Sequence, residues 1–242
     1  GGAGGGAGDL RVPSMSIADQ LKNLSRGRVA IQQRLLDPNT ILFERDASHK
    51  GCGGIKKIGA GGFADVLRCR VVARHRGRAS TAAPQVCAYK KFRMIDAVPH
   101  EMLAEIEIMT MVHDHPNIAE VLGVCLEKSL DGNNPDPIPF GPGFLMEYMP
   151  RGSLRDVLDQ TKKGGVDIPW DARRDIAAQI CNGMNFLHAK GFLHRDIKAA
   201  NVLVVGDAGW TVQIADFGSA KMQTHQSTTG GGAMGGGDKG TH

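Results

Sequence analysis

The chain has 242 residues, of which 41% are hydrophobic and 22% charged, and its formal net charge is +4 at pH 7. This composition is typical of a globular protein, and the charge is too small to indicate nucleic acid or a membrane surface as a partner. The five cysteines form no Cys-x-x-Cys pair, which argues against a zinc site or a disulfide framework and predicts free thiols in a cytoplasmic, intracellular setting. No apolar run approaches the length of a membrane span, although a chain that begins with Gly leaves an upstream segment open.

The N-terminal region, residues 1–50, is expected to be an extension that precedes the folded domain. Its start, GGAGGGAG, predicts a flexible tail, because Gly loses much entropy on ordering and has no side chain to pack. Residues 16–24 favour a short helix, since Ser16 with Asp19 three positions later is a helix-start signature. We prefer a helix that packs beside the domain, with a partner-binding helix as the alternative.

The next part of the chain alternates apolar and polar residues, which is typical of strands. Residues 55–73 alternate around a Gly-rich bend and predict a hairpin, residues 74–84 predict a basic loop, and residues 85–92 predict another strand. Residues 98–115 have helical spacing, and we expect Pro116 to end that helix.

Helical patterns become frequent in the second half of the chain, so the sequence predicts two unlike lobes. The clearest helix covers residues 169–191, with an apolar stripe formed by Ile176, Ile180, Met184 and Leu187. The other expected elements, in chain order, are a strand over 120–127, a loop over 129–143, a strand over 144–149, a helix over 152–163, and two strands over 201–205 and 211–217 joined by a turn.

The segment FLHRDIKAANVLV, residues 192–204, places charged and ionisable side chains between apolar runs. A protein core does not tolerate such charges without partners, which indicates chemistry at the edge of a hydrophobic interior. The following hairpin returns the chain to its origin, so Asp216 is expected near Asn201, and two hard oxygen ligands suit Mg²⁺. Asp196 is then left to face a substrate hydroxyl, and Lys198 to meet negative charge.

The Gly-rich bend, GAGGFADV over residues 59–66, predicts a loop whose backbone amides approach phosphates, because Gly lacks the Cβ that would block them. A dinucleotide-binding fold would require a helix directly after the glycines, whereas ADVLRCRVVA predicts a strand. The Walker phosphate loop is also rejected, since no Gly-Lys-Ser/Thr sequence follows.

Taken in order, these segments resemble the signature motifs of the protein kinase family, serine/threonine type. The resemblance implies a bilobal α+β fold, with an antiparallel sheet and helix C in the N-lobe and a mainly helical C-lobe. The matching motifs are Gly59–Val66 for the Gly-rich loop, Cys87–Lys90 for the strand with the phosphate-binding lysine, His115–Ile118 after helix C, Met146–Met149 for the hinge, His194–Asn201 for the catalytic loop and Asp216–Gly218 for the metal-binding motif.

The resemblance places the N-lobe and hinge at residues 51–149 and a partial C-lobe at residues 150–242. The chain stops before the Ala-Pro-Glu motif and the later C-lobe helices that the family implies. We therefore expect residues 1–242 alone to be poorly stable and to have little or no activity, because the apolar stripe of residues 170–188 would stay partly exposed.

The family's chemistry implies the roles of the site residues. Lys90 would hold the α- and β-phosphates of ATP and be fixed by Glu105, with Glu107 as the alternative partner. Asp196 would accept the proton of the substrate hydroxyl, and Lys198 would neutralise charge near the γ-phosphate. The other residues implied are Asn201 and Asp216 for Mg²⁺; Ile58, Gly59, Ala60, Gly61 and Gly62 over the phosphates; Val66 and Ala88 on adenine; and the backbone of Glu147 and Met149 at the adenine edge.

The acceptor is expected to be Ser or Thr, because Lys198 and the Gly-Thr pair at 240–241 resemble the serine/threonine pattern. The groups most resembled are the tyrosine-kinase-like and MAP-kinase-cascade kinases. The implied partners are a protein substrate and an upstream activator, with no nucleic acid. The alternative is a catalytically inactive truncated kinase or pseudokinase scaffold that acts by binding, against which the intact signature residues argue.

Three further residues depart from, or add to, this pattern. Ala64 stands where the third loop Gly is usual, which affects the expected nucleotide affinity and not the fold. His194 is expected to pack with Phe217 and Met109 rather than act as a base. Arg195 resembles the arginine that receives an activation-loop phosphate, with an unmodified loop as the alternative. The candidate acceptors are Thr224, Ser227, Thr228 and Thr229.

Overall fold

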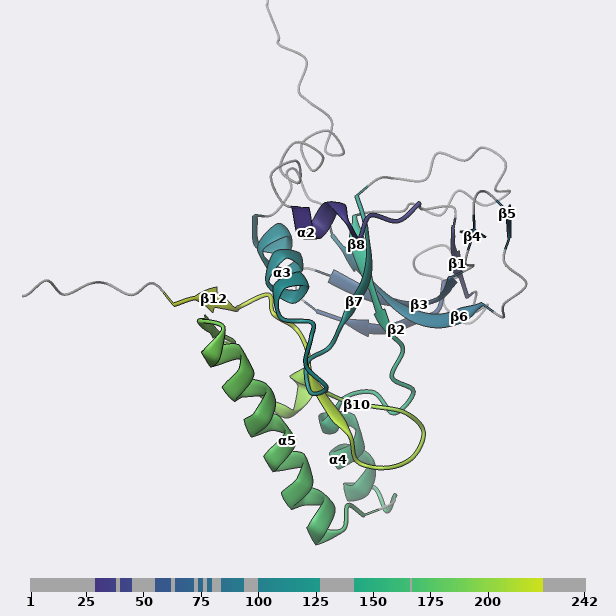
Figure 1. Ribbon diagram of the computed structural model, residues 1–242. Coiled ribbons are helices and arrows are strands. Elements are labelled where there is room, and N and C mark those ends of the chain that lie inside the picture. The colour runs from purple at the N-terminus through teal and green to yellow at the C-terminus, as the bar shows by residue number, and fades with distance from the viewer. Residues whose placement is uncertain are drawn as a thin grey trace, which may run out of the picture.

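The computed structural model describes ten stretches of the chain, and it divides them between a sheet-rich lobe and a helical lobe (Figure 1). The predicted helix over 16–24, Gly62 of the Gly-rich bend, the loop over 129–141 and everything from residue 224 onward lie outside the described residues. The described stretches are 29–37, 40–44, 55–61, 64–71, 74–75, 78–79, 84–93, 100–126, 142–165 and 167–223.

The N-lobe is an antiparallel sheet with helix α3, His100–Met111, packed beside it (Figure 1). Its strand order is β1-β3-β6-β8-β7, and β2 also pairs with β3. The hairpin, strand and helix predicted for this region are confirmed. The strands are β1 Ile41–Phe43, β2 Lys57–Ala60, β3 Ala64–Val71, β6 Gln85–Phe92, β7 Val121–Cys125 and β8 Gly143–Glu147.

Alternation along β6 divides its side chains between two cores. Ala88 and Phe92 join the buried cluster under α3, whereas Cys87 and Tyr89 join a separate cluster on the outer face of the sheet. Lys90 lies on the same face as Ala88 and Phe92 because it is two residues from each. The periodicity of one strand therefore points the lysine toward α3.

Three details differ from the sequence-based expectations. The predicted basic loop contains a small hairpin of β4, Arg74–His75, and β5, Arg78–Ala79, whose two-residue strands are too short to show alternation. Helix α3 ends at Met111, well before Pro116. His113 Nδ1 donates to the Thr110 carbonyl oxygen over 2.8 Å at this end. Helix α2, Val29–Gln32, and strand β1 arise within the predicted extension, and the sequence patterns did not indicate them.

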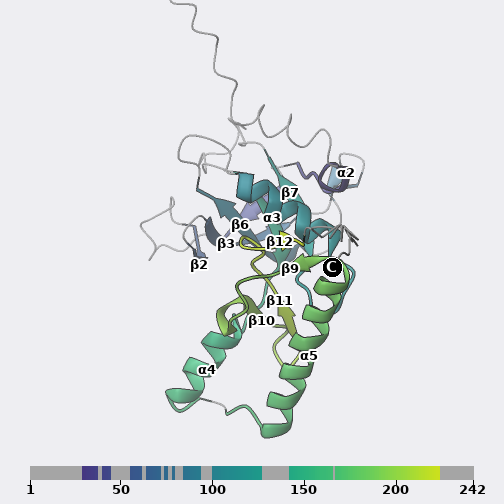
Figure 2. The same ribbon diagram turned by 90° about the vertical axis from the view of Figure 1, so that its left-hand side faces the viewer.

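The C-lobe consists of two helices on either side of a small hairpin (Figure 2). The hairpin packs its valines against α4 and α5. Ile176 and Leu187 of the predicted stripe are fully buried, and Ile180 and Met184 are partly buried, because the hairpin and the turn after α3 cover them. The elements are α4 Leu154–Lys162, α5 Trp170–Ala189, β9 Phe192–Leu193, η3 Ala199–Asn201, β10 Val202–Val204, β11 Val212–Ile214 and β12 Lys221–Met222.

The turn after α3 joins the two lobes. Asn117 Nδ2 donates to Gln179 Oε1 of α5 over 3.1 Å and to the Val212 carbonyl oxygen of β11 over 2.9 Å. Gly183 lets α5 approach this turn, because a Cβ there would lie 2.8 Å from Ile214 Cδ1 and 3.0 Å from the Asn117 carbonyl oxygen.

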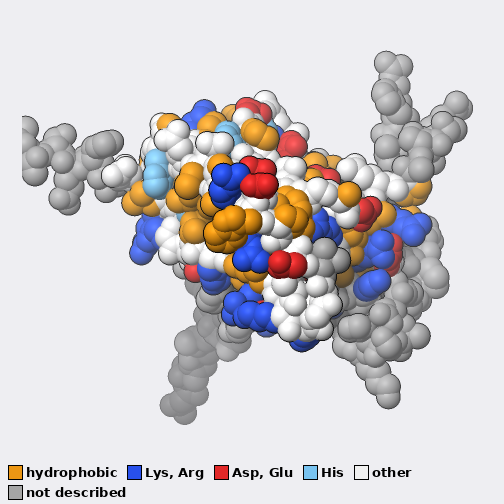
Figure 3. Space-filling view, turned by 90° about the horizontal axis from the view of Figure 1, so that it is seen from below, with side chains coloured by type: hydrophobic (Ala, Val, Ile, Leu, Met, Phe, Trp, Pro, Cys, Tyr) orange, Lys and Arg blue, Asp and Glu red, His pale blue; other side chains and the backbone are white. Residues whose placement is uncertain are grey.

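The lower face of the molecule carries hydrophobic and charged side chains interspersed (Figure 3). Among the described helices, none is long and apolar enough to cross a membrane.

Candidate functional site

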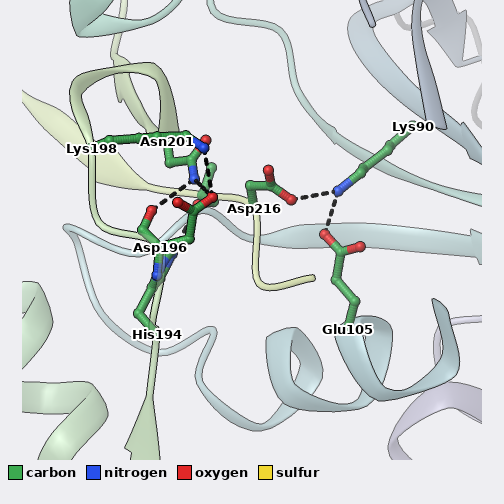
Figure 4. Close-up of polar contacts among 8 residues, drawn as sticks. Lys90, Glu105, His194, Asp196, Lys198, Asn201 and Asp216 are labelled. Atoms are coloured by element: carbon green, nitrogen blue, oxygen red, sulfur yellow. Dashed lines mark hydrogen bonds and ion pairs between the residues drawn. The ribbon is translucent and has the colours of Figure 1, made fainter. Parts of the chain in front are cut away.

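Residues that are far apart in the sequence meet where the two lobes face each other (Figure 4). Lys90 comes from β6, Glu105 from α3, and Asp216 from the segment that follows β11. Lys90 Nζ donates to Glu105 Oε1 over 2.5 Å and to Asp216 Oδ1 over 2.9 Å. The structure therefore brings Glu105, and not the alternative Glu107, to the lysine.

The Lys90–Glu105 pair is largely removed from solvent, since the Lys90 side chain is 14% exposed and that of Glu105 is 3% exposed. Burial by itself lowers the pKa of Lys90, but the carboxylates of Glu105 and Asp216 outweigh burial and raise that pKa above its usual value. Burial also raises the pKa of Glu105, and Lys90 opposes this only in part. Acidification therefore breaks the ion pair by protonating Glu105, while Lys90 keeps its charge.

The loop between β9 and β10 holds a second polar cluster, which centres on Asp196 (Figure 4). Asp196 Oδ2 accepts from Lys198 Nζ over 2.7 Å and from Asn201 Nδ2 over 2.9 Å. The bond from Lys198, followed by that from Asn201, lowers the pKa of Asp196 below its usual value. Both bonds use Oδ2, so Oδ1 of this ionised, partly exposed carboxylate is available to a further donor.

His194 ties this loop to the segment that carries Asp216. It is buried, its Nε2 donates to the Ala215 carbonyl oxygen over 3.1 Å, and its Nδ1 accepts from the Asp196 amide over 3.3 Å. Its ring centroid lies 5.0 Å from that of Phe217, and Phe217 belongs to the same buried cluster as Met109. Burial lowers the pKa of His194, so the imidazole is neutral and acts in packing, as expected.

Two residues of the site have a strained backbone. Arg195 has φ 67° and Asp216 has φ 64°, and within the described part of the chain they are the non-glycine residues with positive φ. Such conformations cost free energy and persist only where the surroundings hold them. Here the bonds of His194 on both sides supply that restraint. Backbone strain of this kind, at Arg195 beside Asp196 and at Asp216 itself, is typical of functional sites.

The donor set of Asn201 and Asp216 fits Mg²⁺. Asn201 is buried and spends its amide nitrogen on Asp196, which leaves its amide oxygen for a ligand. Asp216 remains 49% exposed, and only its Oδ1 contacts Lys90. The Ala215 amide donates to the Asn201 carbonyl oxygen over 2.9 Å, which fixes the two segments side by side. Among the described residues no cluster of three or more His, Cys, Asp or Glu could hold a metal. Two oxygen donors are fewer than Mg²⁺ needs, so an ion at this pair would take its other ligands from phosphates and water.

Three of the predicted nucleotide-binding residues, Val66, Ala88 and Lys90, lie on one face of the sheet. Val66 pairs with both Gly59 and Lys90, and Ala88 pairs with Met146, so these side chains share one face. Among the other predicted contacts, Ile58, Ala60, Gly61 and Glu147 are exposed and Met149 is buried. The Gly61 amide donates to the Ala64 carbonyl oxygen over 2.8 Å, which closes the base of the Gly-rich bend.

Sequence reasoning missed Asp65 as a residue that supports the site. This carboxylate is buried at the start of β3 and contacts Lys57 of β2 and Arg93 after β6. It therefore links the strand that precedes the Gly-rich bend to the strand that carries Lys90. The available signal was an acidic residue in a part of the sequence that is otherwise rich in Lys and Arg. Which of those cations contact Asp65 depends on the strand register, and the sequence does not show it.

The comparisons with known proteins agree with these observations. The family model described as "Protein tyrosine and serine/threonine kinase" matches residues 54–235. The chain is 32% identical over 179 residues to the "Probable serine/threonine-protein kinase PBL18" of Arabidopsis thaliana, and the aligned region covers 71% of this chain and 42% of that relative. It is 33% identical over 183 residues to the Receptor-like protein kinase BRI1-like 3 of Arabidopsis thaliana, covering 71% and 14%. It is 32% identical over 167 residues to the human Dual specificity testis-specific protein kinase 2, covering 69% and 25%. The chain thus spans less than half the length of each of these relatives.

Proposed function

Because the chain belongs to the protein tyrosine and serine/threonine kinase family, we propose that it transfers the γ-phosphate of ATP to serine or threonine hydroxyls of protein substrates. The observation that carries this proposal is the convergence of Lys90, Glu105 and Asp216 within hydrogen-bond distance. In this arrangement Glu105 orients the ammonium group of Lys90, which can contact phosphate oxygens, and Asp216 lies beside it as a ligand for a cation that those oxygens also bind. We also propose that residues 51–149, together with α2 and β1 of the preceding segment, form the N-lobe with its hinge, and that residues 150–242 form part of the C-lobe.

The sheet face binds the nucleotide in this proposal. Adenine lies against Val66 and Ala88 and hydrogen-bonds with the backbone of Glu147 and Met149. The Gly-rich bend covers the phosphates, and Lys90 contacts the α- and β-phosphates. The ion pair with Glu105 orients the ammonium group before the nucleotide arrives, so little reorganisation is needed on binding.

The carboxylate cluster directs the transfer. Asn201 and Asp216 hold Mg²⁺, which when bound neutralises charge on the phosphate oxygens. Asp196 Oδ1 accepts a hydrogen bond from the substrate hydroxyl and orients it in line with the γ-phosphorus. As the new O–P bond forms, the bond to the β–γ bridging oxygen breaks and ADP leaves. The hydroxyl proton passes to Asp196, and Lys198 neutralises charge on the transferred group.

The choice of a serine or threonine acceptor rests on Lys198. Its ammonium group lies 2.7 Å from Asp196 Oδ2, so it stands beside the carboxylate that would orient a hydroxyl. One relative is named a dual specificity kinase, so tyrosine is the acceptor to test against.

Phosphotransfer from γ-labelled Mg·ATP to two peptide libraries, one with Ser/Thr acceptors and one with Tyr, tests the proposal. Because residues 1–242 alone are expected to have little or no activity, the assay uses this chain extended through the later C-lobe helices that the family implies, called here the parent chain. We expect labelling of the first library by the parent chain and a loss of about 10³-fold or more in Asp196→Asn. The matched control is Asp171→Asn, which removes a carboxylate that is 85% exposed on α5 and should leave the rate unchanged. Equal rates for the parent and Asp196→Asn would refute the mechanism. ATP binding by the parent without transfer would favour the pseudokinase scaffold.

A further inference from the structure

Residues 29–36 form a segment, called here the N-terminal strap, that packs against α3. Helix α2 at its start lies against α3 in both views of the fold (Figures 1 and 2). Ile31 of α2 is 0% exposed and belongs to the same buried cluster as Leu103, Ile106 and Met109 of α3. The strap therefore completes the core from which α3 projects Glu105 toward Lys90.

The strap is also fastened to β7, the edge strand that follows α3 in the chain. The Leu36 amide donates to the Val124 carbonyl oxygen over 2.8 Å, and the Val124 amide donates to the Arg34 carbonyl oxygen over 2.7 Å. Arg34 Nη1 donates to the Val121 carbonyl oxygen over 2.8 Å. These bonds give partners to backbone groups of β7 that face away from the rest of the sheet, and they hold α2 at a fixed place beside α3.

Gly123 shows that the strap is fitted to this edge. A Cβ at this position would lie 2.1 Å from Leu36 Cδ1 and 2.5 Å from Leu36 Cγ, so the leucine occupies the space that any side chain at Gly123 would need. Beyond the strap, β1 pairs with β3 at the opposite edge of the sheet, which anchors the same stretch of chain a second time.

We propose that the N-terminal strap holds α3 in the position in which Glu105 reaches Lys90, and that Ile31 is the positioning residue. The proposal rests on the proposed kinase function for its catalytic consequence, but not for its structural one. Helix α3, which carries Glu105, packs against the sheet on one side, and Ile31 of the strap joins the same buried cluster from another. Loss of that contact is expected to populate positions of α3 in which the ion pair is broken.

The test compares Ile31→Ala with Ile55→Ala in the full chain. Both remove the same atoms from a buried isoleucine, at 0% and 2% exposure, but Ile55 belongs to the cluster on the outer face of the sheet and not to the cluster under α3. Hydrogen exchange of the amides of residues 103–111 reports how firmly α3 is held. Global unfolding, measured in denaturant, shows whether the two variants are equally destabilised.

We expect exchange in α3 to rise about tenfold more in Ile31→Ala than in Ile55→Ala at matched global stability. The rate constant kcat should fall about tenfold only in Ile31→Ala, with a smaller change in KM for ATP. Ile31→Val and Ile55→Val, which remove one methylene each, provide the same comparison if an alanine variant fails to fold. Equal exchange in α3 for the two positions would overturn the proposal. A parent chain without phosphotransfer would refute the proposed function, and the exchange comparison would still decide the role of the strap.

Discussion

Replacing Asp65 with Asn tests whether the Gly-rich bend is held by charge. Arg93 Nη2 lies 2.5 Å from Asp65 Oδ1 and Arg93 Nε lies 3.3 Å from Asp65 Oδ2, while Lys57 Nζ lies 2.6 Å from Oδ1. The bonds from Arg93, together with those from Lys57, outweigh burial and lower the pKa of Asp65 from 3.8 to about 2. Asn keeps the size of the side chain but leaves two cations beside each other without a carboxylate.

The pKa shift sets an upper bound on the effect. Each unit corresponds to 1.36 kcal/mol, so a shift of nearly two units gives about 2.5 kcal/mol of folding free energy. Lys57 is 31% and Arg93 44% exposed, and water screens their charges, which reduces the expected loss in Asp65→Asn to about 1–2 kcal/mol at pH 7.

The sign of the pH dependence follows from the direction of the shift. A carboxyl group whose pKa is lower in the folded state stabilises the fold above its unfolded pKa, and this contribution disappears as the pH falls through the folded pKa. The difference in unfolding free energy between the parent chain and Asp65→Asn should therefore have its full value above about pH 5 and shrink between about pH 4 and pH 2.

Urea unfolding across this pH range measures the difference. The matched control is Asp159→Asn, which removes a half-exposed carboxylate paired with Arg155 and Lys162 on α4. The control substitution should lower the unfolding free energy by less than about 0.5 kcal/mol. A loss in Asp65→Asn no larger than in the control, or a difference that does not narrow in acid, would refute the reasoning.

Two further predictions concern single side chains. Glu105→Gln removes the carboxylate that orients Lys90 and should lower kcat/KM for ATP about hundredfold. The control is Glu107→Gln, two positions later on α3, which should leave kcat/KM within about twofold of the parent. Equal losses in kcat/KM for the two variants would show that the ion pair does not matter. Ser153→Ala removes the hydroxyl that accepts from the Asp156 amide over 3.2 Å and donates to Asp156 Oδ2 over 2.6 Å, which breaks one half of the capping box of α4. It should lower the unfolding free energy by about 1 kcal/mol, and an unchanged denaturation midpoint would contradict this.

Local patterns were sufficient for much of the fold. Strand β6 and helices α4 and α5 could be predicted because their periodicity and end signals lie within the segments themselves. Helix α2 and strand β1 could not, since each is too short to show a period and forms only where the finished lobe offers α3 and the edge of β3. The end of α3 was placed too late, since the helix ends at Met111, where His113 caps the Thr110 carbonyl oxygen, and Pro116 lies beyond that end.

The sequence by itself determined which residue types the site contains and in what order they occur. The spacing of Asp196 and Asn201 on one loop, and of Asp216 after a returning hairpin, is local and survives in any fold that keeps those elements. Only the tertiary structure decided that Glu105 and not Glu107 meets Lys90, because residues two positions apart on a helix point about 200° apart and the packing of α3 sets which one turns inward. The tertiary structure also decided the partners of Asp65 and Ile31. Asp65 meets its partners through the register of three strands, and Ile31 meets α3 through the packing of the strap. In both cases the partners are far apart in the sequence, so no local pattern predicts the contact.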